Sequence, residues 1–244
     1  MKNSKEALEG AYNNALDLIL NKKLKEGEKL LEKIYGSGNI NIDILNLLGI
    51  IKYMYCDFYG AKKYWNESLK VSCEDNQASE FIEDIESDDF KIISEKYRDS
   101  LNLIEDKNYL QAIETLEEID KGRGELIEVK IILALLYMII DKKNNAFKNI
   151  ESALSYDISN YKIKEIYNEI KCDLAKDEEK EESEELTFSE SILNLIMILN
   201  YRINSFYEEE LKYRNEEIKS LYEEIKNMNL EIESLNTKKE KLSL

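Results

Sequence analysis

Apolar residues recur at spacings of three and four along most of this chain, with charged residues between them. The stretch Ile163, Ile166, Tyr167 and Ile170 is one example, and such spacing puts the apolar side chains on one face of an α-helix. The 244 residues include no proline and only 8 glycines, so little interrupts a helical backbone. The pattern therefore predicts an all-α protein.

Small residues recur within this pattern at a fixed distance. Ala61 follows Gly27 by 34 positions, Ala146 follows Ala112 by 34, and the step between the two sets is 51. A repeat of 34 residues is typical of stacked helix pairs, in which a small side chain lets the two helices of a pair approach closely. We call Gly27, Ala61, Ala112 and Ala146 the small-residue positions.

Further residues agree with the same period. Leu48-Gly49, Tyr53, Trp65 and Ser68-Leu69 surround Ala61, while Leu133-Ala134, Tyr137, Ile150 and Ala153 surround Ala146. These residues resemble the tetratricopeptide repeat pattern, with units beginning at Leu8, Ile42, Ile93 and Ile127 and covering about residues 8–160. The resemblance implies a superhelix of helix pairs that binds other proteins rather than doing chemistry.

The long step of 51 leaves an additional segment, about residues 75–92, which we interpret as an extra helix or as a repeat that has lost its partner helix. An amphipathic helix at 159–176 is expected to cap the stack, because terminal repeats need a polar outer face. We therefore predict a repeat domain over residues 1–176, an acidic hinge at 177–186, and a separate region at 187–244.

The last region has a heptad pattern, which predicts a coiled coil. Its expected seam is Leu211, Ile218, Leu221, Ile225, Met228, Ile232, Leu235 and Leu242, with Arg214 and Lys239 interrupting it. We expect this helix to form a homodimer. The alternatives are that it folds back as an antiparallel hairpin, packs along the superhelix, or binds another protein.

Charge and composition limit the partners and activities that this chain is expected to have. The formal net charge of −17 disfavours nucleic-acid and anionic membrane partners. The chain has no histidine, so Ser-His and Cys-His nucleophiles are excluded, and no nucleotide-binding glycine motif occurs. We expect no cofactor and no enzyme activity, and a carboxylate-only metal enzyme is the remote alternative.

The beginning of the chain shows no apolar leader and no stretch reaches the ~20 apolar residues that span a bilayer. We expect a cytoplasmic protein, and frequent Ile, Lys, Asn and Tyr favour a bacterial source.

In the tetratricopeptide family, the first helix of each pair lines a concave groove. The resemblance places these residues there: Tyr12, Asn46, Ile50, Tyr53, Tyr97, Leu101, Ile131, Leu135 and Met138. Only Asn46 matches the carboxylate-gripping members of the family, whereas the aromatic and aliphatic lining suits an amphipathic helix. The alternative is that several of these side chains pack inside the helix pairs.

The function expected from these features is an adaptor that binds a protein segment in the groove and self-associates through its last helix. A second hypothesis is a regulatory or chaperone-like subunit whose groove is gated by its own C-terminal helix, about residues 192–206.

Overall fold

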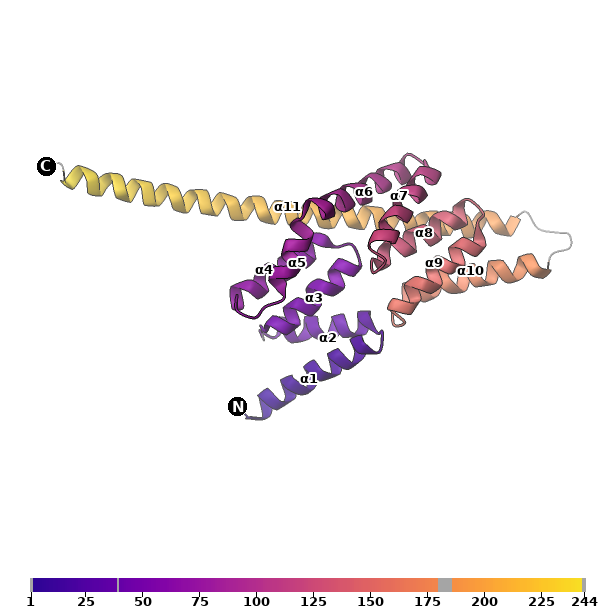
Figure 1. The fold of residues 1–244 in the computed structure, drawn as a ribbon, viewed down its shortest axis with the longest axis horizontal. Coiled ribbons are helices and arrows are strands. Elements are labelled where there is room, and N and C mark those ends of the chain that lie inside the picture. The colour runs from indigo at the N-terminus through magenta and orange to yellow at the C-terminus, as the bar shows by residue number, and fades with distance from the viewer. Residues whose placement is uncertain (1, 39, 180–185, 243–244) are drawn as a thin grey trace. The chain divides into compact units, whose positions relative to one another are not determined.

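The computed structural model describes residues 2–38, 40–179 and 186–242, and side chains over 8–38, 40–175 and 197–229. Its described residues form helices and turns without a strand (Figure 1). The helices are α1 (Lys2–Leu20), α2 (Leu24–Gly36), α3 (Ile42–Met54), α4 (Phe58–Val71), α5 (Ala78–Glu86), α6 (Asp88–Glu105), α7 (Tyr109–Gly122), α8 (Ile127–Ile139), α9 (Lys143–Tyr156), α10 (Tyr161–Glu179) and α11 (Leu186–Leu242). The predicted all-α class is confirmed.

Four helix pairs make up the body of the stack: α1 with α2, α3 with α4, α6 with α7, and α8 with α9. The small-residue positions lie in the second helix of each pair, and all four are buried. At Gly27 there is room for no more than a hydrogen, because an added Cβ would lie 2.6 Å from Ile19 Cγ1. These contacts give the tetratricopeptide-like arrangement that the 34-residue period predicts.

The turn inside each pair is built in the same way four times. Its central residue has a positive φ, at Lys22, Cys56, Lys107 and Asp141. The amide N–H of the following residue bonds to a carbonyl five positions earlier: Lys23 to Leu18 and Asp57 to Lys52 at 2.9 Å, Asn108 to Leu103 and Lys142 to Tyr137 at 2.7 Å. This is a Schellman C-cap, which satisfies carbonyls that the ending helix leaves free. We call these four segments the repeat turns.

The segment between the second and third pairs contains a short helix, α5, within the range where an extra helix was expected. The next helix, α6, begins at Asp88 rather than near Ile93, because the Ser87 side chain caps it by accepting the amide N–H of Phe90 at 3.1 Å. Asn76 fixes the preceding turn by donating to Ser68 Oγ at 3.0 Å and to the Ser72 carbonyl at 2.8 Å.

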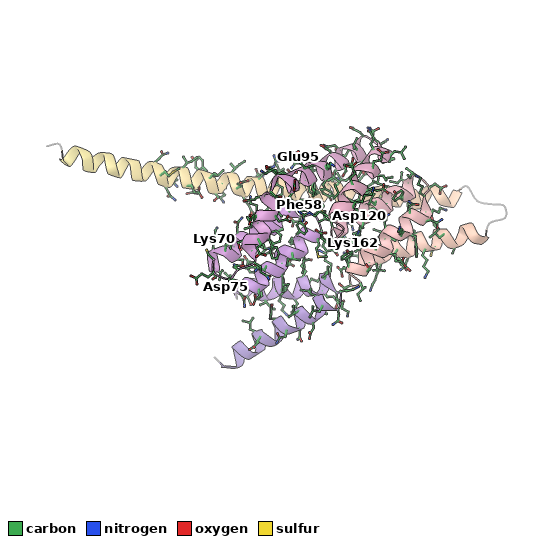
Figure 2. All side chains as sticks on the ribbon, in the orientation of Figure 1. Phe58, Lys70, Asp75, Glu95, Asp120 and Lys162 are labelled. Carbon is green, nitrogen blue, oxygen red and sulfur yellow. The ribbon has the colours of Figure 1, made fainter. Side chains whose placement is uncertain are left out.

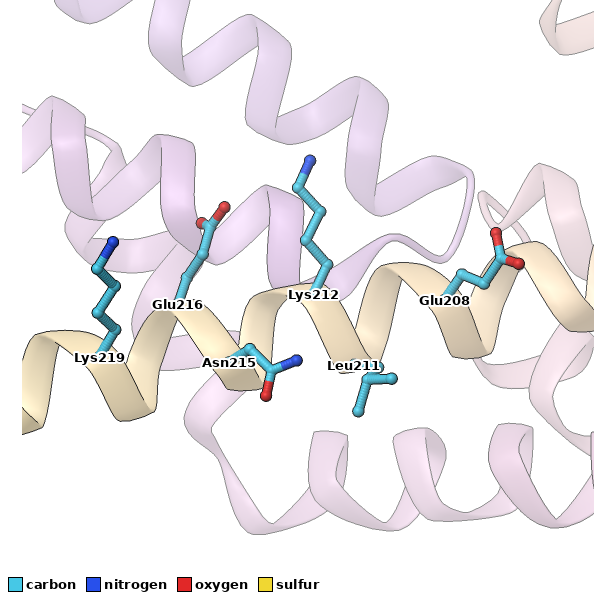
Figure 3. A pocket seen from close by; sticks show the side chains of 6 residues that line it. All are labelled: Glu208, Leu211, Lys212, Asn215, Glu216 and Lys219. Atoms are coloured by element: carbon cyan, nitrogen blue, oxygen red, sulfur yellow. The ribbon is translucent and has the colours of Figure 1, made fainter.

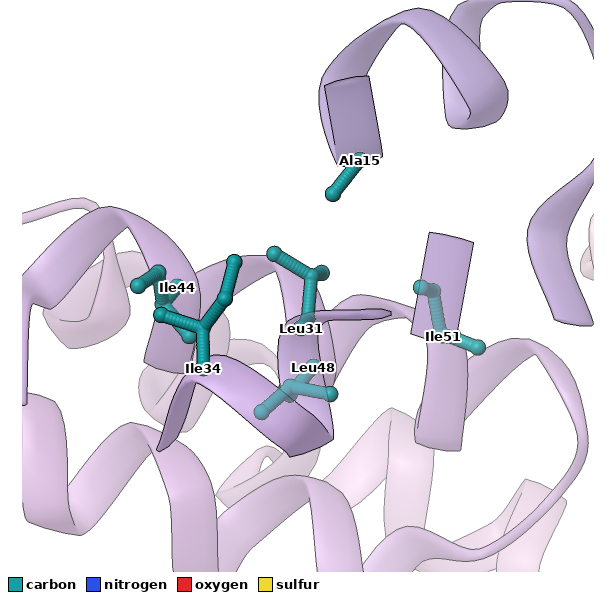
Figure 4. Close-up of a cluster of buried hydrophobic side chains, with 6 residues drawn as sticks. All are labelled: Ala15, Leu31, Ile34, Ile44, Leu48 and Ile51. Carbon is teal, nitrogen blue, oxygen red and sulfur yellow. The ribbon is translucent and has the colours of Figure 1, made fainter. Parts of the chain in front are cut away.

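One part of the core lies between α1, α2 and α3. Buried aliphatic side chains from all three helices meet there, namely Ala15, Leu31, Ile34, Ile44, Leu48 and Ile51 (Figure 4). A second, aromatic part joins α3, α4 and α6, where the Phe58 and Phe90 rings meet edge to face at a centroid distance of 5.0 Å. The apolar side chains of these helices are therefore directed inward.

The chain divides into two compact units, Met1–Ile203 and Asn204–Leu244, with the boundary inside α11. The predicted acidic hinge at 177–186 falls mostly on residues 180–185, which lie outside the described residues. The proposed division at that hinge therefore stays a prediction.

Candidate functional site

The residues predicted for the groove come from α1, α3, α6 and α8, the first helices of the four pairs. Tyr12 and Ile50 are half-buried. The other seven are buried: Asn46, Tyr53, Tyr97, Leu101, Ile131, Leu135 and Met138. Their positions do not test whether these side chains bind a partner, so their role as a binding groove stays a prediction.

Two of these residues are already engaged by polar contacts within the stack. The Tyr53 hydroxyl donates to Glu125 Oε1 at 2.9 Å, and Arg123 Nη1 donates to the same hydroxyl at 3.3 Å. Burial and the Glu125 carboxylate raise the pKa of Tyr53 well above its usual range. Asn46 Nδ2 donates to Asn76 Oδ1 at 3.0 Å, so it helps to hold the turn that precedes α5.

The helix α8 differs from the other first helices because it is buried along almost its whole length. Every residue from Ile127 to Met138 is buried, including the charged Glu128 and Lys130. Lys130 is neutralised by Asp120 at the end of α7, and Figure 2 labels this aspartate. Glu128 is neutralised by Arg202, which belongs to α11.

The ion pair brings residues 197–203 of α11, which we call the covering segment, against the start of α8. Within it, Leu199 is 1% exposed and Ile203 is 2% exposed. Burial alone would lower the pKa of Arg202, but the Glu128 carboxylate more than offsets this and raises it. Lys162 of α10 lies 4.7 Å from the Tyr201 ring centroid and gives the segment a second contact.

Sequence reasoning named residues 192–206 only as a helix that could gate the groove, and it did not single out Glu128 or Arg202. Their pairing joins positions 74 residues apart, and any of 51 acidic residues could have paired with that arginine. The one available signal was Glu128 itself, a charge at the start of the very apolar stretch that forms α8.

A polar cluster joins the first pairs of the stack to the last. Asp157 is 0% exposed, and its Oδ2 accepts from the Tyr55 hydroxyl at 2.7 Å and from the Lys25 amide N–H at 3.1 Å. Asn160 Nδ2 donates to the Tyr55 hydroxyl at 3.0 Å, and the Ile158 amide N–H donates to the Lys22 carbonyl at 2.8 Å. We call Tyr55, Asp157 and Asn160 the closing cluster.

The second unit presents a different surface. Along α11, the apolar side chains of the predicted seam that the structure describes are each more than half exposed: Leu211 at 62%, Ile218 at 63%, Leu221 at 51%, Ile225 at 53% and Met228 at 54%. We call these five residues the apolar stripe. The side chains of Ile232, Leu235 and Leu242 lie outside the description.

A hollow on the same helix offers no enclosed site. Its lining side chains all come from α11 and form a strip along one surface: Glu208, Leu211, Lys212, Asn215, Glu216 and Lys219 (Figure 3). Over the described part of the chain, no group of three or more Asp, Glu or Cys side chains is placed to hold a metal ion. No helix among the described residues is long and apolar enough to cross a membrane.

Comparison with known proteins adds little to this picture. No family model matches the chain, and no curated protein matches it. Among solved structures, it is similar to MamA of AMB-1, with 12% identity and a TM-score of 0.33 over 78% of this chain and 92% of that chain. It is also similar to a double mutant of MamA of RS-1, with 16% identity and a TM-score of 0.31 over 81% and 97%. Likenesses of this size leave the function to be argued from the residues of this chain.

Proposed function

We propose that this chain is a protein-interaction scaffold that self-associates through α11 and binds a helical segment of another protein on its helix pairs. The observation that carries the proposal is the apolar stripe. Its members follow one another by 7, 3, 4 and 3 positions, which is the spacing of a coiled-coil seam. Apolar side chains left exposed in such a row mark an association surface.

The charges beside the stripe favour a parallel pair of α11 helices. Glu217 and Glu224 occupy the positions directly before Ile218 and Ile225. In an antiparallel pair these glutamates would face their counterparts and repel, whereas in a parallel pair they face Tyr222 and Asn229. The partner proposed for the stripe is therefore a second copy of this chain in the same direction.

The mass of the full-length protein in solution tests this proposal. Light scattering on the wild-type chain should give twice the chain mass, and Ile218→Asp with Ile225→Asp should give the single mass, because two buried charges would oppose the seam. Ser220→Asp with Asn227→Asp adds the same charge on the exposed outer face and should leave the dimer intact. A wild-type monomer would overturn the proposal.

A second function, a groove gated by the chain's own C-terminal helix, is favoured by the covering segment. Leu199 and Ile203 are buried while Met197 is 68% exposed, so the segment uses one face to cover the stack. We expect Leu199→Asp with Ile203→Asp to raise the fluorescence of a dye that binds apolar surface. Met197→Asp with Asn200→Asp is the matched control, since both residues are exposed. Equal fluorescence in the two variants would count against gating.

A further inference from the structure

The charge of α8 that pairs with the covering segment is the Glu128 carboxylate. Glu128 is 9% exposed, and the Tyr55, Cys56 and Tyr97 side chains lie near enough to interact with it electrostatically. Burying a carboxylate without a counter-charge is strongly unfavourable. Any segment that covers this carboxylate therefore has to bring a cation with it.

The covering segment meets this requirement with three side chains on one helical face. Leu199 and Ile203 are one turn apart and supply aliphatic contact, while Arg202 stands beside Ile203 and supplies the cation. A guanidinium suits this position better than an ammonium, because it loses less hydration on burial and presents a planar set of donors to a carboxylate.

The described side chains of the segment are seated on one face of the helix. Leu199 and Ile203 are buried, whereas Met197 and Asn200 are exposed. The compact unit that contains this contact ends at Ile203. Because the segment belongs to the same chain, a single-faced contact of this kind has an effective concentration of about a millimolar.

We infer that the surface around Glu128 is the docking site for an amphipathic helix of a partner protein, and that the covering segment occupies this site until the partner displaces it. The partner helix carries an aliphatic residue, an arginine three positions later and an aliphatic residue directly after it, as in Leu199, Arg202 and Ile203. This inference rests on the proposed groove-binding function and names the chemistry of the partner.

Peptide binding to the full-length protein tests the inference. The probe is a fluorescent synthetic peptide of residues 192–207 of this chain, in its natural sequence or with leucine in place of the arginine. On wild-type protein the natural peptide should bind weakly, because the covering segment competes. On Arg202→Leu protein it should bind about tenfold or more tightly, because the internal competitor has lost its ion pair. Lys219→Leu removes one positive charge elsewhere on α11 and should behave as wild type.

The role of Glu128 is tested by reversing its charge. On Glu128→Lys with Arg202→Leu protein, a peptide with glutamate in place of the arginine should bind more tightly than the natural peptide. A merely structural role for Glu128 would not reverse this preference. Circular dichroism of each variant confirms that it is folded before binding is measured.

The inference would be overturned if no peptide binds to folded Arg202→Leu protein, if the natural and leucine peptides bind it equally, or if the reversed charge leaves the preference unchanged. If Arg202→Leu converts a wild-type dimer to a monomer, the occupant is the segment of a second copy and the partner assignment is wrong. Self-association through the apolar stripe is measured separately, so a monomeric wild type with arginine-selective peptide binding would leave this inference standing.

Discussion

Four single residues hold the repeat turns in a conformation that most side chains avoid. Lys22, Cys56, Lys107 and Asp141 have φ between 57° and 61°, in the left-handed region where a Cβ is crowded by the backbone. None of the four is glycine. The recurring hydrogen bonds of the Schellman cap stabilise this conformation despite the cost, so the shape of the turn is specified by the helices that flank it.

Glycine at one of these positions should therefore stabilise the protein. We expect Lys107→Gly to raise the free energy of unfolding by about 0.5–1 kcal/mol, because it relieves the left-handed backbone. Lys148→Gly, at an exposed position within α9, is the matched control and should lower it by about 1 kcal/mol. Denaturant unfolding measures both, and a loss of stability in Lys107→Gly would show that its side chain contributes more than the strain costs.

A glycine inside α3, Gly49, is required because no larger side chain fits there. A Cβ at Gly49 would lie 2.2 Å from Trp65 Nε1, and that indole donates to the Asn46 carbonyl at 3.3 Å. Gly49→Ala should therefore lower the free energy of unfolding by about 1–3 kcal/mol, since the ring has to shift within a packed core. Gly10→Ala, where nothing lies within 4 Å, should raise stability slightly. Thermal unfolding distinguishes the two, and equal melting temperatures would contradict the steric argument.

Comparison of sequence and structure shows which residues made the fold predictable. The small-residue positions predicted the pairs because the close approach of two helices accepts only small side chains. The sequence analysis did not predict the repeat turns, because no common residue type marks them. Their central residues nevertheless follow the same steps of 34 and 51: Lys22, Cys56, Lys107 and Asp141. The pairing of Glu128 with Arg202 depends on tertiary geometry, and local patterns in an acidic chain do not specify it.

At the scale of elements, neighbouring helix pairs are joined by a buried charge cluster. Glu28 of α2 is 4% exposed and lies 2.7 Å from Lys25 Nζ and 3.0 Å from Lys52 Nζ of α3. Burial acts to raise the pKa of Glu28, but the two lysines outweigh it and lower the pKa below its ordinary value of 4.5. The cluster therefore favours the ionised carboxylate in the folded protein.

This cluster gives a defined pH dependence. A carboxyl whose pKa is lower in the folded state stabilises the protein above its unfolded pKa, and that stability is lost as the pH falls through the folded pKa. Glu28→Gln should therefore cost about 1–3 kcal/mol near neutral pH, and its difference from wild type should shrink below the ordinary value of 4.5. Melting temperatures from pH 7 to pH 3 measure this, with Glu9→Gln, at an exposed site on α1, as control.

At the scale of the whole molecule, the direction of the proposed dimer is open to a chemical test. In a parallel pair, position 221 of one chain lies beside position 221 of the other. Leu221→Cys, in a chain whose exposed Cys73 and Cys172 are replaced by serine, should form a disulfide-linked dimer under mild oxidation. Lys219→Cys in the same background places the thiols on the outer face and should cross-link poorly. Equal yields would contradict a parallel seam.

The closing cluster has a consequence for how the repeat domain unfolds. A stack in which each pair touches only its neighbours behaves as a one-dimensional array and frays from its ends. Here Asp157 beyond the fourth pair binds Tyr55 and Lys25 of the first two, so the two ends of the array stabilise each other. We expect one cooperative calorimetric transition in the wild-type repeat domain, and a broadened or split one in Asp157→Ala but not in Asp99→Ala. The hydrogen bonds of a single carboxylate would then turn a row of separable repeats into one folding unit.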